Sequence, residues 1–375
     1  MKSVVYLDNA SSSFPKPPGV IRAVTRALAK TGANPNRAGH ALGRAASRIV
    51  FETREALAEL LRLPNPERII FTKNATEGIN LALKGLLRRG DRVAISGLEH
   101  NAVIRPLTSL RKRGVTVDHA PLTVHGLPDP RRIPDVKLMV TVTGSNVTGA
   151  LADVEALAAA CRKKGVMLML DTAQTAGAVP TGFGAADIVA GTGHKALFGP
   201  QGTGFVWFRE GVEPEPMIEG GTGSLSESAV MPPFWPDRHE AGTLNTPGIA
   251  GLGAAVRYLM RRGVEDVRAH EVDIMRALLE RLRNDERIVT YPPFEPEARA
   301  SLLLFNVRGM DPAAVGEALD RQGIAARVGL HCAPEAHRFL GTFPAGGVRV
   351  SPGPFTTRRG VARFFDALHR VLKGR

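Results

Sequence analysis

Hydrophobic positions between residues 68 and 208 form short apolar runs that alternate with segments of helical periodicity. The apolar runs predict buried strands at 68–72, 92–96, 138–143, 166–170, 187–191 and 202–208. The segments between them predict helices at 75–87, 101–114, 153–165 and 171–177. Strand, helix and strand in this order is typical of βαβ units, so we expect an α/β fold with a mainly parallel sheet flanked by helices.

The pattern changes beyond Gly263. An amphipathic stretch predicts a long connecting helix at 264–283. A mixed set of elements follows it: a strand at 302–309, a helix at 313–323, a strand at 347–352 and a closing helix at 358–372. We therefore predict a large domain over residues 15–260 and a smaller α+β domain over residues 261–375. We expect the N-terminal segment 1–14 to pack on the smaller domain.

Composition fits an ordinary globular protein. The chain has 375 residues, of which 43% are hydrophobic and 23% charged, which is enough for a large core. Its two cysteines, Cys161 and Cys332, give no disulfide framework and no familiar metal-binding spacing. The N-terminal apolar run is too short for a signal peptide, and no apolar stretch is long enough to span a membrane. We expect a cytoplasmic protein without membrane association.

The net charge of +13 raises the question of a nucleic-acid or acidic partner. Basic residues are scattered, however, at the ends of predicted helices, where they complement the helix dipole. Aromatic residues make up only 5% of the chain, so a platform for stacking bases has little support. We do not expect specific nucleic-acid binding.

Polar residues follow five of the predicted strands where each strand ends. They are Lys73 to Thr76, Glu99 to Asn101, Ser145 with Asn146, Asp171 with Gln174, and Thr192 with His194 and Lys195. In open α/β sheets, ligands bind outside the carboxyl ends of the strands. The pattern predicts that these side chains converge on one rim of the sheet.

Asp171 and Lys195 are the most informative of these residues. Alone, an Asp after a strand is often a cap, and a loop Lys is usually solvated. At neighbouring strand ends, the pair offers a carboxylate for a pyridinium nitrogen and an amine for a carbonyl carbon, which pyridoxal phosphate requires. The N–H groups of Ala75 and Thr76 would open a helix and face a phosphate, although a simple N-cap explains that stretch equally well.

Ten stretches, in order, carry a resemblance to a known family. They are "YLDNASSSFPKP", "FTKNATEGIN", "EHNAVIRPL", "SNVTGAL", "DTAQTAG", "TGHKALFGPQGTG", "GGTGS", "EAGTLNTPGI", "GLHCAPEAH" and "VRVSPGPF". From Tyr6 to the last helix the chain resembles the cysteine desulfurase and selenocysteine lyase family of class V, fold-type I pyridoxal phosphate enzymes. The resemblance implies a homodimer that uses pyridoxal 5'-phosphate and L-cysteine, with L-selenocysteine as the alternative substrate, and that passes sulfur to an acceptor protein.

The resemblance also implies a role for individual residues. Lys195 would bind the cofactor covalently and move the proton at Cα, and Asp171 would pair with the ring nitrogen. His100 would stack on the ring, and Gln174 would bind its phenolic oxygen. The phosphate would be held by Ala75, Thr76, Thr192, His194 and Thr222, the last from the second subunit. The substrate carboxylate would be held by Asn146 and Arg349, and a guanidinium fork suits that task.

Cys332 lies on a loop bounded by Gly and Pro. A metal site would need more ligands than Cys332, His331 and His337 supply, and a buried filler role fits Cys161 better. By resemblance, the motif of Arg327, Gly329, His331 and Cys332 presents a nucleophilic thiolate that takes sulfur from cysteine and leaves alanine. Alternatives are a selenocysteine lyase, an aminotransferase, which the cysteine motif disfavours, and a basic binding protein that has kept the fold without the chemistry.

Overall fold

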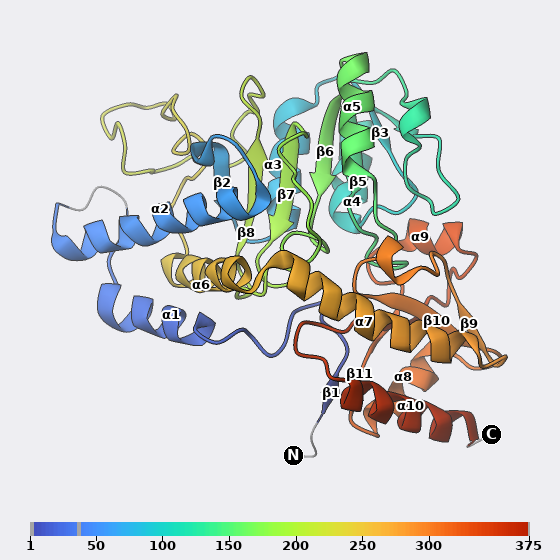
Figure 1. The fold of residues 1–375 in the computed structure, drawn as a ribbon. Coiled ribbons are helices and arrows are strands. Elements are labelled where there is room, and N and C mark those ends of the chain that lie inside the picture. The colour runs from blue at the N-terminus through green and yellow to red at the C-terminus, as the bar shows by residue number, and fades with distance from the viewer. Residues whose placement is uncertain (1–3, 36–38, 374–375) are drawn as a thin grey trace.

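The computed structural model describes residues 4–35 and 39–373, and its largest element is a seven-stranded sheet (Figure 1). The strands are β2 (Ile69–Thr72), β3 (Arg92–Ile95), β4 (Thr116–His119), β5 (Leu138–Val142), β6 (Met167–Asp171), β7 (Ile188–Thr192) and β8 (Gly204–Phe208). They lie in the order β2-β8-β7-β6-β5-β3-β4. Neighbouring strands from β4 to β7 pair in parallel, whereas β8 is antiparallel to both β7 and β2. The carboxyl ends of β2, β3, β5, β6 and β7 therefore share one edge.

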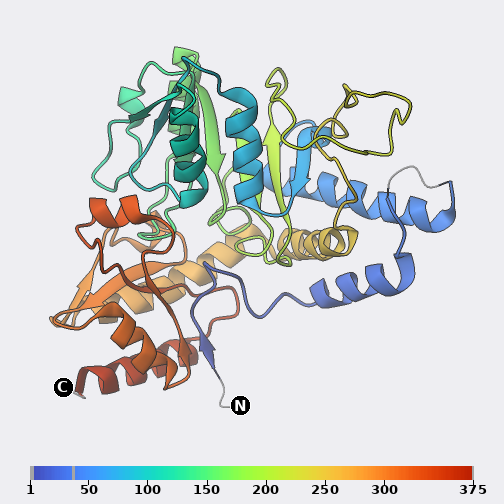
Figure 2. The same ribbon diagram turned by 180° about the vertical axis from the view of Figure 1, so that it is seen from behind.

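Helices cover both faces of this sheet (Figures 1 and 2). They are α1 (Val20–Arg26), which continues into a π-helical turn at Ala27–Thr31, α2 (Ala41–Leu61), α3 (Ala75–Leu86), α4 (Asn101–Arg111), α5 (Val154–Lys164) and α6 (Thr246–Arg262). One core cluster joins α2, α5 and α6 to one face of the sheet, and another joins α3 and α4 to the other face. The sheet is thus buried on both sides, as its unbroken apolar strands require.

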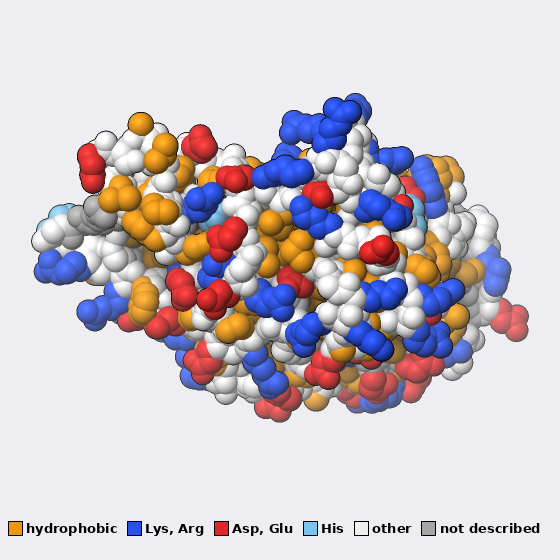
Figure 3. All heavy atoms as spheres, turned by 90° about the horizontal axis from the view of Figure 1, so that it is seen from above, with side chains coloured by type: hydrophobic (Ala, Val, Ile, Leu, Met, Phe, Trp, Pro, Cys, Tyr) orange, Lys and Arg blue, Asp and Glu red, His pale blue; other side chains and the backbone are white. Residues whose placement is uncertain are grey.

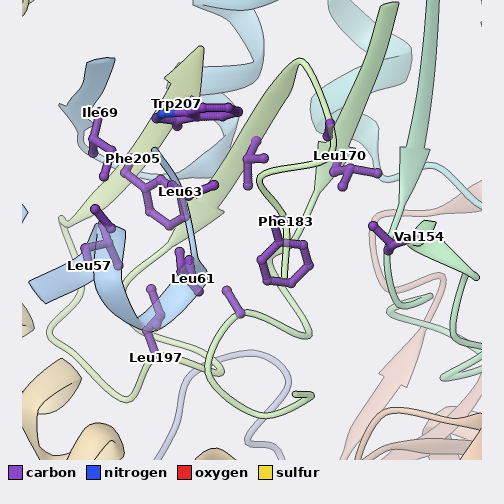
Figure 4. Packing of buried hydrophobic residues seen from close by; sticks show 14 of the residues in the cluster. Leu57, Leu61, Leu63, Ile69, Val154, Leu170, Phe183, Leu197, Phe205 and Trp207 are labelled. Atoms are coloured by element: carbon purple, nitrogen blue, oxygen red, sulfur yellow. The ribbon is translucent and has the colours of Figure 1, made fainter. Parts of the chain in front are cut away.

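Successive residues of β6 show how the strands serve both cores. Leu168 and Leu170 belong to the cluster on the α2, α5 and α6 face, whereas Met169 between them belongs to the cluster on the α3 and α4 face. Figure 4 shows part of the first cluster, in which Phe183, Phe205 and other large side chains pack against residues of α2. This two-sided packing fixes the register of the strands whose ends carry the polar residues.

The C-terminal part contains a four-stranded antiparallel sheet in the order β12-β13-β10-β9. Its strands are β9 (Ile288–Thr290), β10 (Leu303–Val307), β12 (Arg327–Gly329) and β13 (Gly347–Val350), and its helices are α7 (Val264–Arg283), α8 (Pro312–Asp320), α9 (Pro334–Phe339) and α10 (Arg358–Lys373). The short strand β1 (Val5–Tyr6) pairs in parallel with β11 (Ile324–Ala325). The N-terminal segment therefore contacts this C-terminal part.

The mainly parallel sheet and the predicted strands and long helices are confirmed, with two differences. Asp171 is the last residue of β6, and residues 173–177 form turns rather than a helix, because Gly177 has a left-handed φ of 87°. The predicted domain boundary after residue 260 falls in the last turn of α6, and only Gly263 separates α6 from α7. The division of the chain into two domains stays a prediction.

Candidate active site

A pocket opens at the shared carboxyl edge of the large sheet. Its lining residues come from the ends of five strands and the loops after them, and they include Ala75, Thr76, His100, Asn146, Asp171, Gln174, Thr192, His194 and Lys195. The predicted convergence of polar residues is therefore found for most of them, whereas Lys73, Glu99, Asn101 and Ser145 do not line the pocket. Cys332, Arg349 and Thr222 do not line this pocket.

One end of the pocket is the beginning of α3. The Asn74 side chain caps the helix by accepting a hydrogen bond from Glu77 N at 3.0 Å. The N–H groups of Ala75 and Thr76 belong to the first turn, where a helix offers no acceptor of its own. The N-cap and an anion site are therefore compatible here, since the cap leaves these two donors facing the pocket.

Asp171 is buried and Lys195 is half-buried, and both line the pocket. Burial raises the pKa of Asp171, while hydrogen bonding from Ala173 N and the Lys195 charge oppose that shift. Burial lowers the pKa of Lys195 to about 8, against the stabilising charge of Asp171. Lys195 is thus a far better supplier of a neutral, nucleophilic amine near neutral pH than an ordinary lysine.

His100 is the N-cap of α4. Its Nδ1 accepts a hydrogen bond from Ala102 N at 3.0 Å, so that nitrogen carries no proton and the remaining ring proton lies on Nε2. Burial, followed by the charge of Lys195, lowers the pKa of His100 to about 4. A neutral ring with one face on the pocket can stack on a flat aromatic ligand.

Buried polar atoms without a partner among the described residues mark the pocket as a ligand site. They include Nδ1 of His194 and Oδ1 of Asn146. Gln174 is held by a 3.0 Å hydrogen bond from Nε2 to Ala10 O, which leaves the second N–H of Nε2 available as a donor. A phosphorylated pyridine fits these donors, because they combine a helix N-terminus, a carboxylate, an amine and an aromatic ring.

Backbone and side-chain hydrogen bonds tie the exposed Cys332 to this rim. Asn101 N donates to Cys332 O at 2.8 Å, and Asn146 Nδ2 donates to His331 O at 2.6 Å. The Sγ atom of Cys332 lies 3.9 Å from Nη2 of Arg327. Cys161, by contrast, is buried in α5, and burial raises its pKa to about 11.

Arg349 is held by the N-terminal segment. Its Nη2 donates to Asp8 Oδ1 at 3.1 Å and to Ser11 Oγ at 2.8 Å, and its Nη1 donates to Asn146 O at 2.8 Å. Ser11 Oγ also accepts from Arg327 Nη1 at 2.7 Å and donates to Asp8 Oδ1 at 2.6 Å. The Ser11 hydroxyl therefore joins the two arginines to one carboxylate.

Sequence reasoning assigned no role to Asp8, Ser11 or Glu99. The stretch "YLDNASSS" was an available signal, but the bridge that Asp8 forms with Ser351, just beyond β13, depends on tertiary structure. Glu99 is fully buried, and Ser96 donates to its Oε1 at 2.7 Å while its Oε2 has no partner among the described residues. Burial raises the pKa of Glu99 to about 7, and the Asp171 charge adds to the effect.

Thr222 lies away from the pocket, on the long irregular segment between β8 and α6 (Figure 1). It is buried, and its Oγ1 accepts a hydrogen bond from Ser224 N at 3.3 Å. A contribution of Thr222 to the pocket of a second subunit stays a prediction.

A separate cavity of about 210 Å³ lies between β2 and the segment 239–245, and Lys73 lines this cavity rather than the pocket at the carboxyl edge of the sheet. Within residues 4–35 and 39–373, no group of three or more His, Cys, Asp or Glu side chains could hold a metal ion, and no helix is long and apolar enough to cross a membrane. On the face in Figure 3, basic side chains lie among acidic ones.

Comparison with known proteins agrees with this geometry. A model of the family described as "Aminotransferase class-V" matches residues 5–364. The chain belongs to the class-V aminotransferase family. It is 34% identical to a "Probable cysteine desulfurase" of Methanothermobacter thermautotrophicus, over 99% of this chain and 95% of that protein. It is 32% identical to a "Cysteine desulfurase" of Serratia proteamaculans, over 99% and 94% of the two chains.

Solved structures of this class-V family share the fold. The apo structure of a cysteine desulfurase from Thermococcus onnurineus superposes with a TM-score of 0.90 at 30% identity, covering 99% of this chain and 95% of that one. The S-sulfonic acid form of the cysteine desulfurase CsdA from Escherichia coli gives a TM-score of 0.86 at 27% identity, with the same coverage of both chains. The predicted family and fold are confirmed.

Proposed function

We propose that the protein is a pyridoxal phosphate-dependent cysteine desulfurase that converts L-cysteine to L-alanine and retains the sulfur on Cys332. The observation that carries the proposal is the docking of the Cys332 loop, through Asn101 and Asn146, onto the rim that holds Lys195 and Asp171. These hydrogen bonds fix the loop that carries the thiol beside the pocket that contains the amine and the carboxylate. The names of the relatives give the same activity.

The pocket residues divide the work of holding the cofactor. Asp171 would pair with the ring nitrogen, His100 would stack on the ring, and Gln174 would bind the phenolic oxygen. The phosphate would be held by Ala75, Thr76, Thr192, His194 and Thr222 of a second subunit. When bound, pyridoxal phosphate supplies a conjugated ring that stabilises negative charge at the substrate Cα.

Lys195 would remove the proton from the substrate Cα, since its pKa of about 8 leaves a useful fraction of free amine near neutral pH. The Cys332 thiolate would attack the substrate sulfur. An S–S bond forms, the bond between the substrate Cβ and its sulfur breaks, and that carbon gains a proton to become the methyl group of alanine. The substrate sulfur ends as a persulfide on Cys332, so the step needs no external oxidant or reductant.

The substrate carboxylate would be bound by Arg349 and Asn146. Arg349 is almost fully buried and presents its guanidinium toward Asp8, whose side chain is 23% exposed. An incoming carboxylate offers Arg349 the same charge and geometry as Asp8, so it can replace Asp8 as the partner.

We further propose a homodimer, in the cytoplasm, that passes its persulfide sulfur to an acceptor protein.

The test compares alanine formation from L-cysteine by wild type, Cys332→Ser and Cys161→Ser. We expect wild type and Cys161→Ser to form alanine and sulfide in equal amounts with a thiol present. We expect Cys332→Ser to bind pyridoxal phosphate and cysteine, with spectral changes, but to form almost no alanine. Near-wild-type activity of Cys332→Ser on cysteine would require another group to break the C–S bond and would refute the assignment.

A second function to test is that of a selenocysteine lyase, because exposed Cys332 beside Arg327 does not itself discriminate sulfur from selenium. Selenium leaves carbon more readily, so Cys332→Ser would keep activity on L-selenocysteine if that were the natural reaction.

Light scattering tests the homodimer, and an active monomer would contradict a contribution from Thr222 of a second subunit.

A further inference from the structure

The backbone that carries Cys332 has a disfavoured conformation. His331 and Cys332 have φ values of 52° and 58°, and both lie in the left-handed region that residues other than Gly rarely adopt. Two such residues in succession persist only where the surrounding structure holds them. The hydrogen bonds from Asn101 and Asn146 hold the carbonyl groups of this turn, but neither contacts the His331 side chain.

A chain of hydrogen bonds among buried side chains holds the His331 ring. His331 Nε2 lies 3.4 Å from Arg327 O, and His331 Nδ1 lies 3.3 Å from His337 Nε2. His337 Nδ1 lies 2.7 Å from Thr342 Oγ1. The two imidazoles are stacked with 5.5 Å between their centroids, and His331, His337 and Thr342 are all buried. This series of hydrogen bonds joins β12, the turn that carries Cys332 and the segment after α9.

The chemistry of the partners fixes the direction of every bond in this chain. A carbonyl oxygen only accepts, so His331 Nε2 carries a proton. Burial and the nearby charges of Arg349 and Arg327 keep the pKa of His331 far below its usual value, so this ring is neutral and its Nδ1 must accept. His337 Nε2 therefore donates, and burial lowers the pKa of His337 to about 4, which leaves its Nδ1 as an acceptor. The single hydrogen of the Thr342 hydroxyl goes to this Nδ1 at 2.7 Å rather than to His337 O, which lies 3.3 Å away.

We propose that His337 and Thr342 are positioning residues for Cys332, because they fix the neutral tautomer of His331 and thereby hold the left-handed turn that presents the thiol. Arg327 links this chain to the sulfur directly. Its carbonyl accepts from His331, and its guanidinium lies 3.9 Å from Cys332 Sγ. A loosened His331 ring frees both the turn and the strand residue beside the thiol. The inference rests on the proposed role of Cys332 as the nucleophile.

Two pairs of variants separate positioning from packing. Thr342→Val removes the hydroxyl with little change in shape, and Thr342→Ser keeps the hydroxyl. His337→Phe keeps a ring of similar size without its nitrogens, and His337→Gln keeps one acceptor and one donor in the order that the chain requires. Each protein is measured for the rate at which iodoacetamide alkylates Cys332, located by peptide mass, and for kcat and KM with L-cysteine. Thermal unfolding of each holoenzyme records its stability.

We expect Thr342→Val and His337→Phe to lower kcat by about 10- to 100-fold, the scale of a misplaced reacting group, with KM within about 3-fold of wild type. Alkylation of Cys332 should slow, since the sulfur leaves the neighbourhood of Arg327. Thr342→Ser and His337→Gln should restore both rates. Wild-type rates in Thr342→Val, or equal losses in both members of a pair, would overturn the proposal.

The alkylation rate also separates this proposal from the proposed function. If wild type forms no alanine from cysteine, the desulfurase assignment fails, whereas alkylation still shows whether Thr342 and His337 position the thiol. If His337→Phe does not fold, the Thr342 pair decides alone. Variants that unfold at lower temperature but keep wild-type alkylation and kcat would assign the chain to stability and contradict positioning.

Discussion

The depressed pKa of Lys195 makes a quantitative prediction about cofactor attachment. An amine attacks a carbonyl carbon only in its neutral form, so the attachment rate follows the neutral fraction. With a pKa of about 8, close to 10% of Lys195 is neutral at pH 7. A lysine at its ordinary value of 10.5 would be about 0.03% neutral. The neutral fraction is thus about 300-fold larger at pH 7, and we expect the attachment of pyridoxal phosphate to be faster by about this factor than at an ordinary lysine.

The assay mixes apo protein with excess pyridoxal phosphate at a series of pH values, reduces samples with borohydride after fixed times, and quantifies the Lys195 peptide that carries the reduced adduct. We expect the rate to rise with pH and to reach half its plateau near pH 8. Asp171→Asn removes a charge that raises this pKa, so its midpoint should shift lower. Lys195→Ala controls for labelling elsewhere. A midpoint near 10.5, or a label on another lysine in wild type, would refute the account of the pocket.

Three other predictions concern residues around the site. Ser11→Ala should raise KM for cysteine by about 10-fold, because Arg327 and Arg349 lose the hydroxyl that accepts a hydrogen bond from each of them. An unchanged KM in steady-state assays would contradict this role of Ser11. Burial raises the pKa of Glu271 in α7 to about 8. Between pH 4.5 and pH 8 the folded protein therefore keeps a proton that the unfolded chain has released, and the free energy of unfolding should fall as pH rises through this range. Glu271→Gln should remove that slope and add up to about 3 kcal/mol at pH 7, as measured by denaturant unfolding. Cys161→Ser should lower the melting temperature slightly and leave kcat unchanged, since buried Cys161 packs as a small hydrophobe.

Much of the fold could be predicted from local patterns. The periodicity at 264–283 coincides with α7, and the apolar runs coincide with buried strands whose side chains alternate between two cores. The antiparallel direction of β8 could not be predicted, because a short buried strand has the same apolar pattern in either direction. The segment 171–177 was wrongly predicted as a helix, since hydrogen bonds from its own polar side chains favour turns.

The candidate site was predictable where residues follow strand ends. Lys195, Asp171 and His100 occupy one pocket because parallel strands bring their carboxyl ends to one edge. The link between Ser11, Arg327 and Arg349 was not predictable, because it joins residues more than 300 positions apart. The order of protons in His331, His337 and Thr342 likewise depends on three-dimensional contacts that sequence spacing does not contain.

The central claim is that Cys332 takes the sulfur atom of cysteine. The most direct test incubates the holoenzyme with isotopically labelled L-cysteine in the absence of reductant, blocks thiols by alkylation, and measures the masses of the peptides that contain Cys332 and Cys161. The account predicts one additional labelled sulfur atom on the Cys332 peptide, matched by an equal amount of alanine, and an unmodified Cys161 peptide. Alanine formed without labelled sulfur on Cys332 would contradict it.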